Sequence, residues 1–294
     1  MSSVAGLASS SSAQQREHQL IRWLQGHDSL LLGFSGGVDS AYLACVAIEA
    51  VGPERFLAVI GRSASYPAEQ WQTARDVAAR SGISVLEVDT HEMDDPRYVA
   101  NPANRCYFCK TELWSVLERV RAARGIATII DGTNADDLSD YRPGKKAAAE
   151  QRVRSPLAEL GFTKSDIREL SRVRGIPTWS QPSSPCLSSR LPYGTPVTIA
   201  RLSLIERAER ALRELGVTGN LRVRHHGDTA RVEMDLAQLE HWRPAARSAD
   251  LCRAVQRAGF AHVLLDPRGF RSGSLNVLAG VVADRGDSAP LSGA

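Results

Sequence analysis

The stretch of sequence that decides the fold is LLLGFSGGVDS, residues 30–40. It opens with an apolar run, Leu30 to Phe34, that has the length and composition of a buried parallel strand. Two adjacent glycines follow, and then apolar residues recur at helical spacing. A strand, a glycine turn and a helix in this order bring backbone N–H groups and the positive end of a helix to one point. The stretch therefore predicts an anion-binding loop at the end of the first strand.

The following part of the chain repeats this alternation of strands and helices. The apolar patterns predict strands at 56–60, 83–88 and 127–130, and helices at 68–80, 107–124 and 163–174. Thr163 and Asp166 fit a capping box at the start of the last of these helices. The alternation predicts an α/β fold, a Rossmann-like domain with a parallel sheet and helices on both faces. Ligands in such sheets bind at the carboxyl ends of the strands, where the glycine turn lies.

A second, smaller domain is predicted after a junction rich in Ser and Pro at 180–196. A helix from about Ile199, a strand pair at 221–224 and 230–233, and a last strand at 262–265 indicate a C-terminal α/β domain. We expect a nucleotide-binding domain over 15–190 and a substrate or oligomerisation domain over 195–283. The Ser/Ala/Gln-rich residues 1–14 and the polar tail 284–294 are expected to be disordered.

Composition narrows the class of protein. Of 294 residues, 43% are hydrophobic and 23% charged, as in an ordinary globular protein. The net charge of +3 is too small to indicate a dedicated nucleic-acid binder. No apolar run has membrane-spanning length and the N-terminus lacks a secretory pattern, so we expect a cytoplasmic protein without a membrane partner. Five cysteines in a chain of this size favour thiol or metal chemistry over disulfides.

The glycine turn carries side chains suited to a nucleotide. Ser35 and Ser40 can donate hydroxyl hydrogen bonds, Gly36 and Gly37 allow close backbone approach, and Asp39 can hold Mg²⁺ against phosphates. The turn is not a Walker P-loop, because no Gly-Lys-Ser/Thr ending is present. It resembles the PP-loop of the ATP pyrophosphatases, which cleave ATP to AMP and pyrophosphate. The alternative is a glycine turn that only connects two elements; the order of strand, motif and helix favours ATP binding.

A second polar segment follows the fourth predicted strand. Gly132, Thr133 and Asn134 come directly after Asp131 at the same expected edge of the sheet, which makes them candidates for ATP binding. Their alternative is a solvated acidic turn, since Gly, Asn and Asp are common turn residues. The neighbouring PP-loop pattern favours ATP binding by these residues over a solvated turn.

Three cysteines are candidates for chemistry. Cys106 and Cys109 form a CxxC pair before a long predicted helix, and Cys186 lies in the junction. Such a pair could be redox-active, half of a zinc site or two unlinked thiols; three cysteines can also hold three irons of a [4Fe–4S] cluster and leave the fourth iron open. Cys45 and Cys252 lie in amphipathic helices and are interpreted as small apolar residues.

Arginines near and after the junction are candidates for anion binding. Arg190 could supply a cation to the sulfur of Cys186 or bind phosphate. Arg222 and Arg224 are two apart on a predicted strand, so their guanidiniums share a face that suits phosphate, unless that face is merely solvated. His225 and His226, beside a Gly-Asp turn, are expected to be surface residues rather than ligands.

Six segments together resemble the LarE family of ATP-dependent sulfur transferases. They are residues 35–40, 101–110, 131–134, 155–157, 186–194 and 221–224. The PP-loop by itself indicates only the superfamily, and the segment that begins at Cys186 is the specific part. The resemblance runs from about residue 18 to about residue 276.

The resemblance implies a role in making the nickel-pincer nucleotide cofactor from a pyridinium biscarboxylate mononucleotide. A substrate carboxylate attacks the α-phosphate of ATP, and a sulfur nucleophile then displaces AMP to give a thiocarboxylate. In one version of the family the cysteine matching Cys186 gives up its own sulfur; in the other, three cysteines hold a [4Fe–4S] cluster that carries an extra sulfide. With Cys106 and Cys109 present, the chain resembles the cluster version. The resemblance also implies homo-oligomers, a phosphate site at Arg222 and Arg224, and an acidic partner at Glu233.

Three other functions fit parts of the sequence. A PP-loop tRNA thiolase can use the same cysteines, but no appended RNA-binding module is evident. An ammonia-using ligase related to NAD or GMP synthetases would leave the cysteines without a role. A non-catalytic nucleotide-binding module is compatible with the fold, because a fold does not fix a function.

Overall fold

A computed structural model describes residues 12–138 and 143–271. The chain divides into two compact units, of which the first ends at Leu187 and lacks residues 100–103, while the second comprises Ala100–Ala103 and the chain from Ser188 on. The disorder expected for 1–11 and 284–294 falls outside the described residues. Ser12 to Gln14, also expected to be disordered, instead begin helix α1 (Ser12–Gln25), because the side chain of Ala13 is buried in the core.

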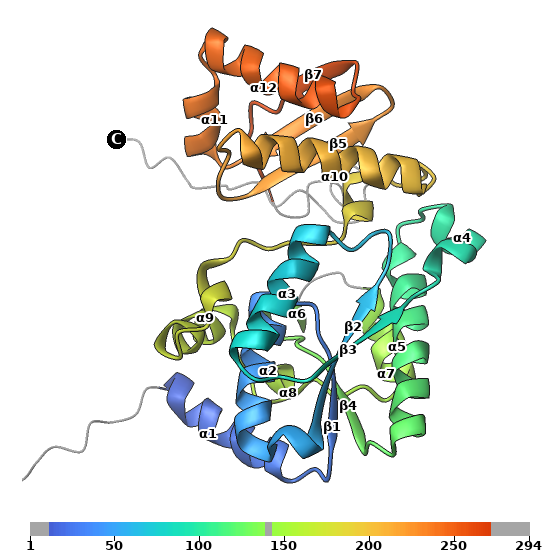
Figure 1. The fold of residues 1–294 in the computed structure, drawn as a ribbon, viewed down its shortest axis with the longest axis vertical. Helices are drawn as coiled ribbons and strands as arrows, with labels where there is room; N and C mark the ends of the chain where they lie inside the picture. The colour runs from blue at the N-terminus through green and yellow to red at the C-terminus, as the bar shows by residue number, and fades with distance from the viewer. Residues whose placement is uncertain (1–11, 139–142, 272–294) are drawn as a thin grey trace, which may run out of the picture. The chain divides into compact units, whose positions relative to one another are not determined.

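The first unit is built on a four-stranded parallel sheet (Figure 1). Its strands lie in the order β3-β2-β1-β4, and each neighbouring pair is parallel. Their bounds are β1 (Leu30–Gly33), β2 (Phe56–Arg62), β3 (Val85–Asp89) and β4 (Thr128–Ile130). The predicted Rossmann-like parallel sheet is therefore confirmed.

Alternate residues of the central strand face opposite layers of helices. Leu30 and Leu32 belong to one core cluster, with apolar side chains of α1, α2 (Val38–Val51), α3 (Ala68–Arg80) and α9 (Lys164–Val173). Leu31 points the other way, into a cluster with Trp114 of α5 (Arg105–Arg124) and Ala147 of α7 (Gly144–Glu150). All three leucines are fully buried, which explains why the strand is a continuous apolar run rather than an alternating one.

Several element ends differ from the sequence-based expectation. The capping box of Thr163 and Asp166 at the start of α9 is confirmed. Helix α5 begins at Arg105, two residues early, so the CxxC pair lies in the first turns of this helix and not in a loop before it. Strand β3 begins at Val85 because the N–H of Ile83 still donates to Ala78 at the end of α3. The short elements of this unit are α4 (Pro96–Val99), α6 (Ala135–Leu138), α8 (Pro156–Glu159), η1 (Pro53–Arg55), η2 (Glu92–Asp94) and η3 (Pro177–Ser180).

The second unit is a smaller α/β body. Its sheet has the order β5-β6-β7, with β5 (Leu221–His226) antiparallel to β6 (Thr229–Met234) and β6 parallel to β7 (His262–Leu265). Its helices are α10 (Ile199–Glu214), α11 (Leu236–Trp242) and α12 (Ala245–Ala258), preceded by the short η4 (Leu187–Arg190). Residues 100–103 belong here because Asn101 donates from Nδ2 to the carbonyls of Pro192 (2.8 Å) and Thr195 (2.9 Å). No helix in the described ranges is both long and apolar enough to span a membrane.

Candidate active site

The PP-loop stretch, Ser35 to Ser40, lies between the end of β1 and the start of α2, as the sequence predicts. Gly37 precedes the first residue of α2, and no side chain caps this end of the helix in the described structure. The first N–H groups of a helix have no acceptor within the helix itself. The loop thus presents backbone donors and the positive helix end together, which is the arrangement that binds phosphate.

Helix α3 and the segment before it fix the shape of the loop. Gly36 has a φ of 66°, and a Cβ there would lie 2.5 Å from the Cβ of Ala74, so a larger residue cannot be accommodated. The carbonyl of Ser35 accepts hydrogen bonds from the Tyr66 hydroxyl (2.9 Å) and from Gln70 Nε2 (3.0 Å). The loop is therefore held in shape before any nucleotide arrives.

Asp39 has one engaged and one open carboxylate oxygen. Its Oδ2 accepts from Lys164 Nζ at 3.0 Å, whereas Oδ1 is buried and has no hydrogen-bond partner among the described residues. A buried acceptor without a partner is costly unless a ligand satisfies it. A carboxylate oxygen without a protein partner fits the hard oxygen donors that Mg²⁺ prefers.

The second predicted segment packs directly on the loop. A Cβ on Gly132 would lie 2.9 Å from the backbone nitrogen of Ser40 and 3.1 Å from its Cα, so only glycine permits this approach. The shape of the segment depends on Asp131, whose carboxylate accepts from the Thr133 hydroxyl (2.9 Å) and the Ser155 hydroxyl (2.7 Å). The structure thus brings residues 131–134 and the PP-loop together.

Asn134 offers a second unsatisfied group at this place. It is fully buried, its Oδ1 accepts from the N–H of Asp137 (3.1 Å), and its Nδ2 has no partner among the described residues. A solvated turn would not bury an amide in this way. Asp39 and Asn134 therefore supply an acceptor and a donor that are both available to a ligand.

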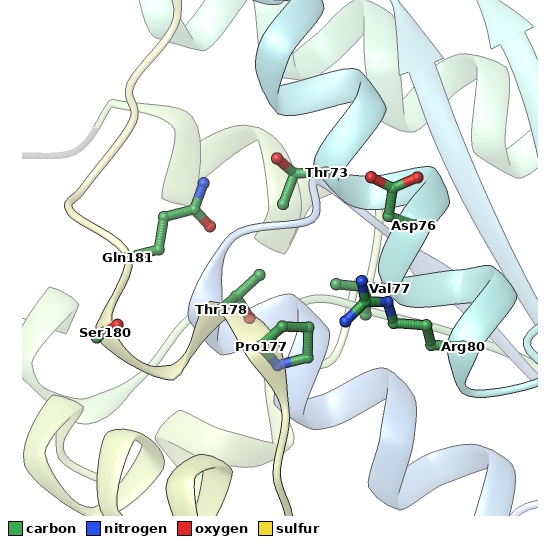
Figure 2. Close-up of a pocket in the computed structure, with 8 residues that line it drawn as sticks. All are labelled: Thr73, Asp76, Val77, Arg80, Pro177, Thr178, Ser180 and Gln181. Carbon is green, nitrogen blue, oxygen red and sulfur yellow. The ribbon is translucent and has the colours of Figure 1, made fainter. Parts of the chain in front are cut away.

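A pocket between α3 and η3 adjoins the support of the loop (Figure 2). Gln181 lies on its wall and donates from Nε2 to Gln70 Oε1 at 3.4 Å, and Gln70 in turn holds the Ser35 carbonyl. The remaining lining residues are Thr73, Asp76, Val77, Arg80, Pro177, Thr178 and Ser180. No sequence pattern predicts this pocket.

The three candidate cysteines all lie in the first unit as free thiols. Cys106 and Cys109 stand in the first turns of α5, and Cys186 ends an irregular segment. The next residue, Leu187, is anchored by its N–H to the carbonyl of Ser65 at 2.8 Å. Burial, with Glu92 and Cys186 close by, raises the pKa of the Cys109 thiol. Cys106 in the helix and Cys186 in the junction therefore both act on the ionisation of Cys109.

Arg105 is a buried cation beside these thiols. It is 3% exposed, and its Nη2 lies 3.9 Å from the sulfur of Cys106. Burial acts to lower the pKa of this guanidinium, but the charges of Cys186 and Cys106 outweigh burial, so the pKa is raised. Arg105 was singled out only as part of the family motif, although its place directly before the CxxC pair was a usable signal.

Glu92 is a buried carboxylate on the side of Cys109. It is 1% exposed and accepts from the hydroxyls of Ser65 (3.3 Å) and Thr90 (2.8 Å). The sequence analysis missed Glu92, Ser65 and also Lys164, because each comes from a loop or helix end whose position depends on tertiary packing.

A metal ion and an iron–sulfur cluster make different demands on these thiols. In the described ranges no group of three His, Cys, Asp or Glu residues converges so as to hold a metal ion. A cubane cluster takes one thiolate at each of several irons, so its cysteines surround a volume rather than a point. Cys106, Cys109 and Cys186 are the three cysteines that such a cluster would use.

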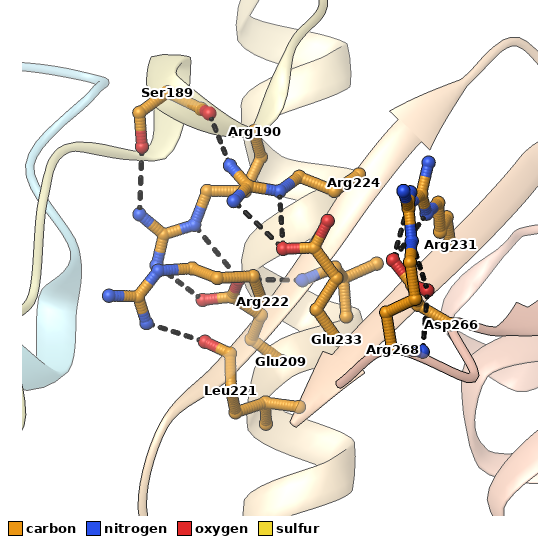
Figure 3. A network of polar contacts seen from close by, with 11 residues as sticks. Ser189, Arg190, Glu209, Leu221, Arg222, Arg224, Arg231, Glu233, Asp266 and Arg268 are labelled. Atoms are coloured by element: carbon orange, nitrogen blue, oxygen red, sulfur yellow. Dashed lines mark hydrogen bonds and ion pairs between the residues drawn. The ribbon is translucent and has the colours of Figure 1, made fainter. Parts of the chain in front are cut away.

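The second unit contains a buried network of arginines and glutamates (Figure 3). Arg190 is 1% exposed and forms a two-point ion pair with Glu209, with both N–O distances at 2.9 Å. Arg224 binds Glu233 Oε2 through Nε (3.0 Å) and Nη2 (2.8 Å), and also donates to the carbonyl of Ser189 (2.8 Å). Arg190, expected as a cation for Cys186 or for phosphate, is thus engaged by a carboxylate of its own unit.

Arg222 completes this network. It is 4% exposed, its guanidinium lies 5.1 Å from the centre of the Phe270 ring, and Nη1 donates to the carbonyl of Leu221 (2.6 Å). Burial and the nearby Arg190 lower the pKa of Arg222 to about 9. The alternative of a solvated strand face is excluded, because Arg222 and Arg224 are both buried.

Two further sequence-based expectations have clear outcomes. His225 is 6% exposed and packs edge-on against Phe260, so the expectation of a surface residue is wrong for it; His226 at the strand end is exposed. Strand β5 is covered on both faces, which a short polar stretch does not reveal.

Cys45 is buried in α2, as expected of a small apolar residue, and Cys252 is half-buried in α12.

Comparison with known proteins agrees with this geometry. Residues 19–101 match the NAD synthase family, and these residues include the PP-loop. A glutamine-dependent NAD⁺ synthetase of Aquifex aeolicus is 36% identical over 68 residues, which is 23% of this chain and 12% of that protein. This likeness is local.

Other relatives match over almost their whole length. An uncharacterized protein of Synechocystis is 43% identical over 249 residues, 85% of this chain and 92% of that protein. The pyridinium-3,5-bisthiocarboxylic acid mononucleotide synthase of Lactiplantibacillus plantarum is 34% identical over 264 residues, 87% of this chain and 92% of that protein. With a PP-loop and this extent of similarity, the chain belongs to the LarE family and is an ATP-dependent sulfur transferase.

Proposed function

We propose that the chain adenylates a carboxylate of a pyridinium biscarboxylate mononucleotide and converts it to a thiocarboxylate, for synthesis of the nickel-pincer nucleotide. The product named for the Lactiplantibacillus relative supports this substrate. The observation that carries the proposal is that Cys106, Cys109 and Cys186 are free thiols within the unit that contains the PP-loop. A synthetase that uses ammonia has no need of such an arrangement.

The first step makes the carboxylate reactive. A carboxylate oxygen attacks the α-phosphorus of ATP, and the bond from this phosphorus to the bridging oxygen breaks, so that pyrophosphate leaves with the electron pair. The backbone N–H groups of residues 35–40 and the N-terminal end of α2 stabilise the departing charge. Asp39 would hold Mg²⁺ through its open Oδ1, and Mg²⁺ would supply further neutralisation of the phosphates. Asn134 Nδ2 and the backbone at Gly132 are available to orient the nucleotide.

The second step replaces oxygen by sulfur. A sulfur nucleophile attacks the acyl carbon, the carbon–oxygen bond breaks, and AMP leaves with the electron pair to give the thiocarboxylate. Cys106, Cys109 and Cys186 would hold a [4Fe–4S] cluster, whose open iron would supply a sulfide for this attack. The protein orients these thiols through the anchor of Leu187 on Ser65 and through the start of α5.

The arginine network of the second unit is proposed as the site for the phosphate of the substrate. Arg190 pairs with Glu209 and Arg224 pairs with Glu233, and Arg222 lies beside both arginines. Burial first, and then repulsion from Arg190, lowers the pKa of Arg222, and an anion near this guanidinium would offset both effects. Bidentate guanidinium binding suits phosphate geometry.

The test is anaerobic purification, followed by an absorption spectrum, iron and sulfide analysis, and an assay of pyrophosphate release with the mononucleotide. We expect a coloured protein with about four irons per chain and pyrophosphate release that depends on the substrate. Cys106→Ala should lose the cluster and the sulfur transfer but keep pyrophosphate release, whereas Cys252→Ala should keep all three. An iron-free protein whose Cys186 becomes dehydroalanine after turnover would show instead that Cys186 gives up its own sulfur.

A further inference from the structure

We propose that the pocket between α3 and η3 is a second small-molecule site, which binds a free α-amino acid as its zwitterion and thereby raises the affinity of the PP-loop for ATP. The pocket has a volume of about 350 Å³, near the lower end of the range of about 300 to 1,000 Å³ that small-molecule sites occupy. No step of the proposed reaction uses a residue that lines it. The inference therefore goes beyond the proposed function and does not depend on the carboxylate substrate.

The hydroxyl of Thr178 indicates that the pocket holds a ligand. Thr178 lines the pocket and is only 3% exposed, yet its Oγ1 has no hydrogen-bond partner among the described residues. A buried hydroxyl without a partner costs free energy, and valine would fill the same space without that cost. The hydroxyl is therefore placed to form its hydrogen bond with an occupant of the pocket.

Gln181 supplies a second polar atom on the same wall. Its Oε1 is buried and has no partner within the described ranges. Arg168 fixes this wall, because its guanidinium donates to the carbonyls of Trp179 (2.6 Å) and Gln181 (2.8 Å). An amide oxygen only accepts hydrogen bonds, so an occupant that satisfies Gln181 must carry a donor.

Helix α3 supplies two opposite charges on the facing wall. Asp76 and Arg80 both line the pocket, and they lie on one face of α3 because they are four residues apart. Figure 2 shows the guanidinium of Arg80 turned back over Val77 towards Thr178. Asp76 accepts from Gln72 Nε2 at 2.9 Å, and neither Asp76 nor Arg80 forms an ion pair in the part of the chain that the structure describes. Both charges are thus available to an occupant.

These four groups together match an amino-acid zwitterion. A carboxylate can accept from the guanidinium of Arg80 in a bidentate way and from the hydroxyl of Thr178. An ammonium carries only donors, which suit the carboxylate of Asp76 and Oε1 of Gln181. In an α-amino acid a single carbon separates the two charged groups, as neighbouring opposite charges on one helix face require. Inorganic phosphate fits less well, because its charge would lie beside the carboxylate of Asp76.

Gln181 connects the pocket to the PP-loop. Its Nε2 donates to Gln70 Oε1 at 3.4 Å, and Gln70 Nε2 donates to the carbonyl of Ser35 at 3.0 Å. An ammonium bound to Oε1 of Gln181 fixes this amide, and with it the orientation in which Gln70 holds the loop. An occupied pocket therefore favours the loop conformation that binds ATP, and by linkage ATP strengthens amino-acid binding by the same factor.

The first experiment tests binding at the pocket. A panel of the protein amino acids is screened against the full chain by saturation-transfer NMR, with propionate and ethylamine as probes that each lack one charged group. We expect at least one amino acid to bind and neither of these two probes to do so. Calorimetry with the strongest amino acid should show the Kd raised about tenfold in Thr178→Val and in Arg80→Met. Arg75→Met is the control on the same helix, because Arg75 lies over the Trp71 ring at 4.9 Å and does not line the pocket.

The second experiment tests the connection to the PP-loop. ATP affinity is measured with the α,β-methylene analogue of ATP, which cannot be cleaved to AMP and pyrophosphate. A saturating concentration of the amino acid should lower the Kd of the analogue about fivefold, whereas Gln70→Ala should bind the amino acid but lose this change. Because the readout is binding, a chain that shows both effects but transfers no sulfur would overturn the proposed function and not this inference.

Three results would overturn the inference. The first is that no amino acid binds, or that propionate binds as tightly as the best of them. The second is an amino-acid Kd that is unchanged in both Thr178→Val and Arg80→Met, because the amino acid would then bind elsewhere. The third is a lower Tm in Thr178→Val without ligand, since it would show that the hydroxyl has a partner within the protein; we expect the Tm to stay the same or to rise. An unchanged Kd of the ATP analogue would overturn the effect on the PP-loop.

Discussion

The ammonium of Lys164 lies 3.0 Å from Oδ2 of Asp39, while Oδ1 of the same carboxylate is buried and has no hydrogen-bond partner among the described residues. The two residues are 125 positions apart, at the start of α9 and in the first turn of α2. Lys164 therefore engages one oxygen of Asp39 and leaves the other without a partner among the described residues. Mutation of Lys164 therefore changes the charge next to Asp39 without removing the carboxylate itself, which a mutation within the loop cannot do.

The first prediction concerns the charge at Asp39. Asp39→Asn removes the charge that would hold Mg²⁺, so pyrophosphate release should fall by about a hundredfold or more. Lys164→Met removes a competing positive charge, so the Mg²⁺ concentration for half-maximal pyrophosphate release should fall. Both are measured by titrating Mg²⁺ at saturating ATP. Lys146→Met, on the exposed side of α7, is the control, and a rise of the half-maximal Mg²⁺ concentration in Lys164→Met would contradict the assignment.

The second prediction concerns the contact between the two loops. Gly132→Ala would place a methyl group 2.9 Å from the backbone nitrogen of Ser40, and backbone cannot move aside as a flexible side chain can. We expect the KM for ATP to rise at least about tenfold, because misplaced binding groups have large kinetic effects, with a small change in Tm. Gly26→Ala meets nothing closer than 3.4 Å and should leave the KM unchanged. Equal effects of the two substitutions would show that the contact has no role in ATP binding.

Much of the fold followed from local patterns in the sequence. Leu30 to Leu32 are buried on both faces of the sheet, and such a strand is a continuous apolar run that a sequence shows directly. The capping box at Thr163 depends on residues three positions apart and was also visible. Gly36 and Gly132 were placed at the correct edge because parallel strands end on the same side.

The charged side chains of the site were harder to predict from the sequence than the order of its strands and helices. Lys164 and Glu92 reach the loop or the thiols only through tertiary packing, and both look like ordinary surface positions in the sequence. His225 shows the same limit, because its burial depends on packing against Phe260 and not on the strand's own polar sequence. A single sequence gives the order of elements better than the partners of its charges.

A third prediction follows from the pair of Arg190 and Glu209 in the second unit. Burial acts to raise the pKa of Glu209, but Arg190 outweighs it and the pKa is lowered. Because the folded-state pKa lies below the unfolded value of about 4.3, the stabilisation is present above that pH and is lost as the pH falls through the folded-state pKa. Glu209→Gln should reduce the free energy of unfolding at pH 7 by about 3 kcal/mol, since it removes the carboxylate charge that faces a buried arginine.

The measurement is urea unfolding of the parent and of Glu209→Gln at a series of pH values. The difference between the two proteins should be full near neutrality and should shrink below about pH 4, where the parent carboxylate becomes protonated. The exposed Glu214 lies on the same helix, and Glu214→Gln should change stability little at any pH. A difference that stays constant down to strongly acidic pH would argue against the ion pair as its cause.

The last prediction concerns the two donors on the Ser35 carbonyl. Gln70 Nε2 and the Tyr66 hydroxyl both donate a hydrogen bond to this oxygen. Loss of either hydrogen bond should destabilise the binding conformation of the loop by about 1 kcal/mol, which corresponds to a rise of about fivefold in the KM for ATP. Gln70→Ala and Tyr66→Phe are therefore each expected to raise the KM with little change in kcat, and the double variant to raise it further. Gln72→Ala removes only a hydrogen bond to Asp76 within α3 and serves as the control. If Gln70→Ala binds ATP as the parent does, the PP-loop keeps its shape without this support and the pocket at Gln181 has no connection to the nucleotide.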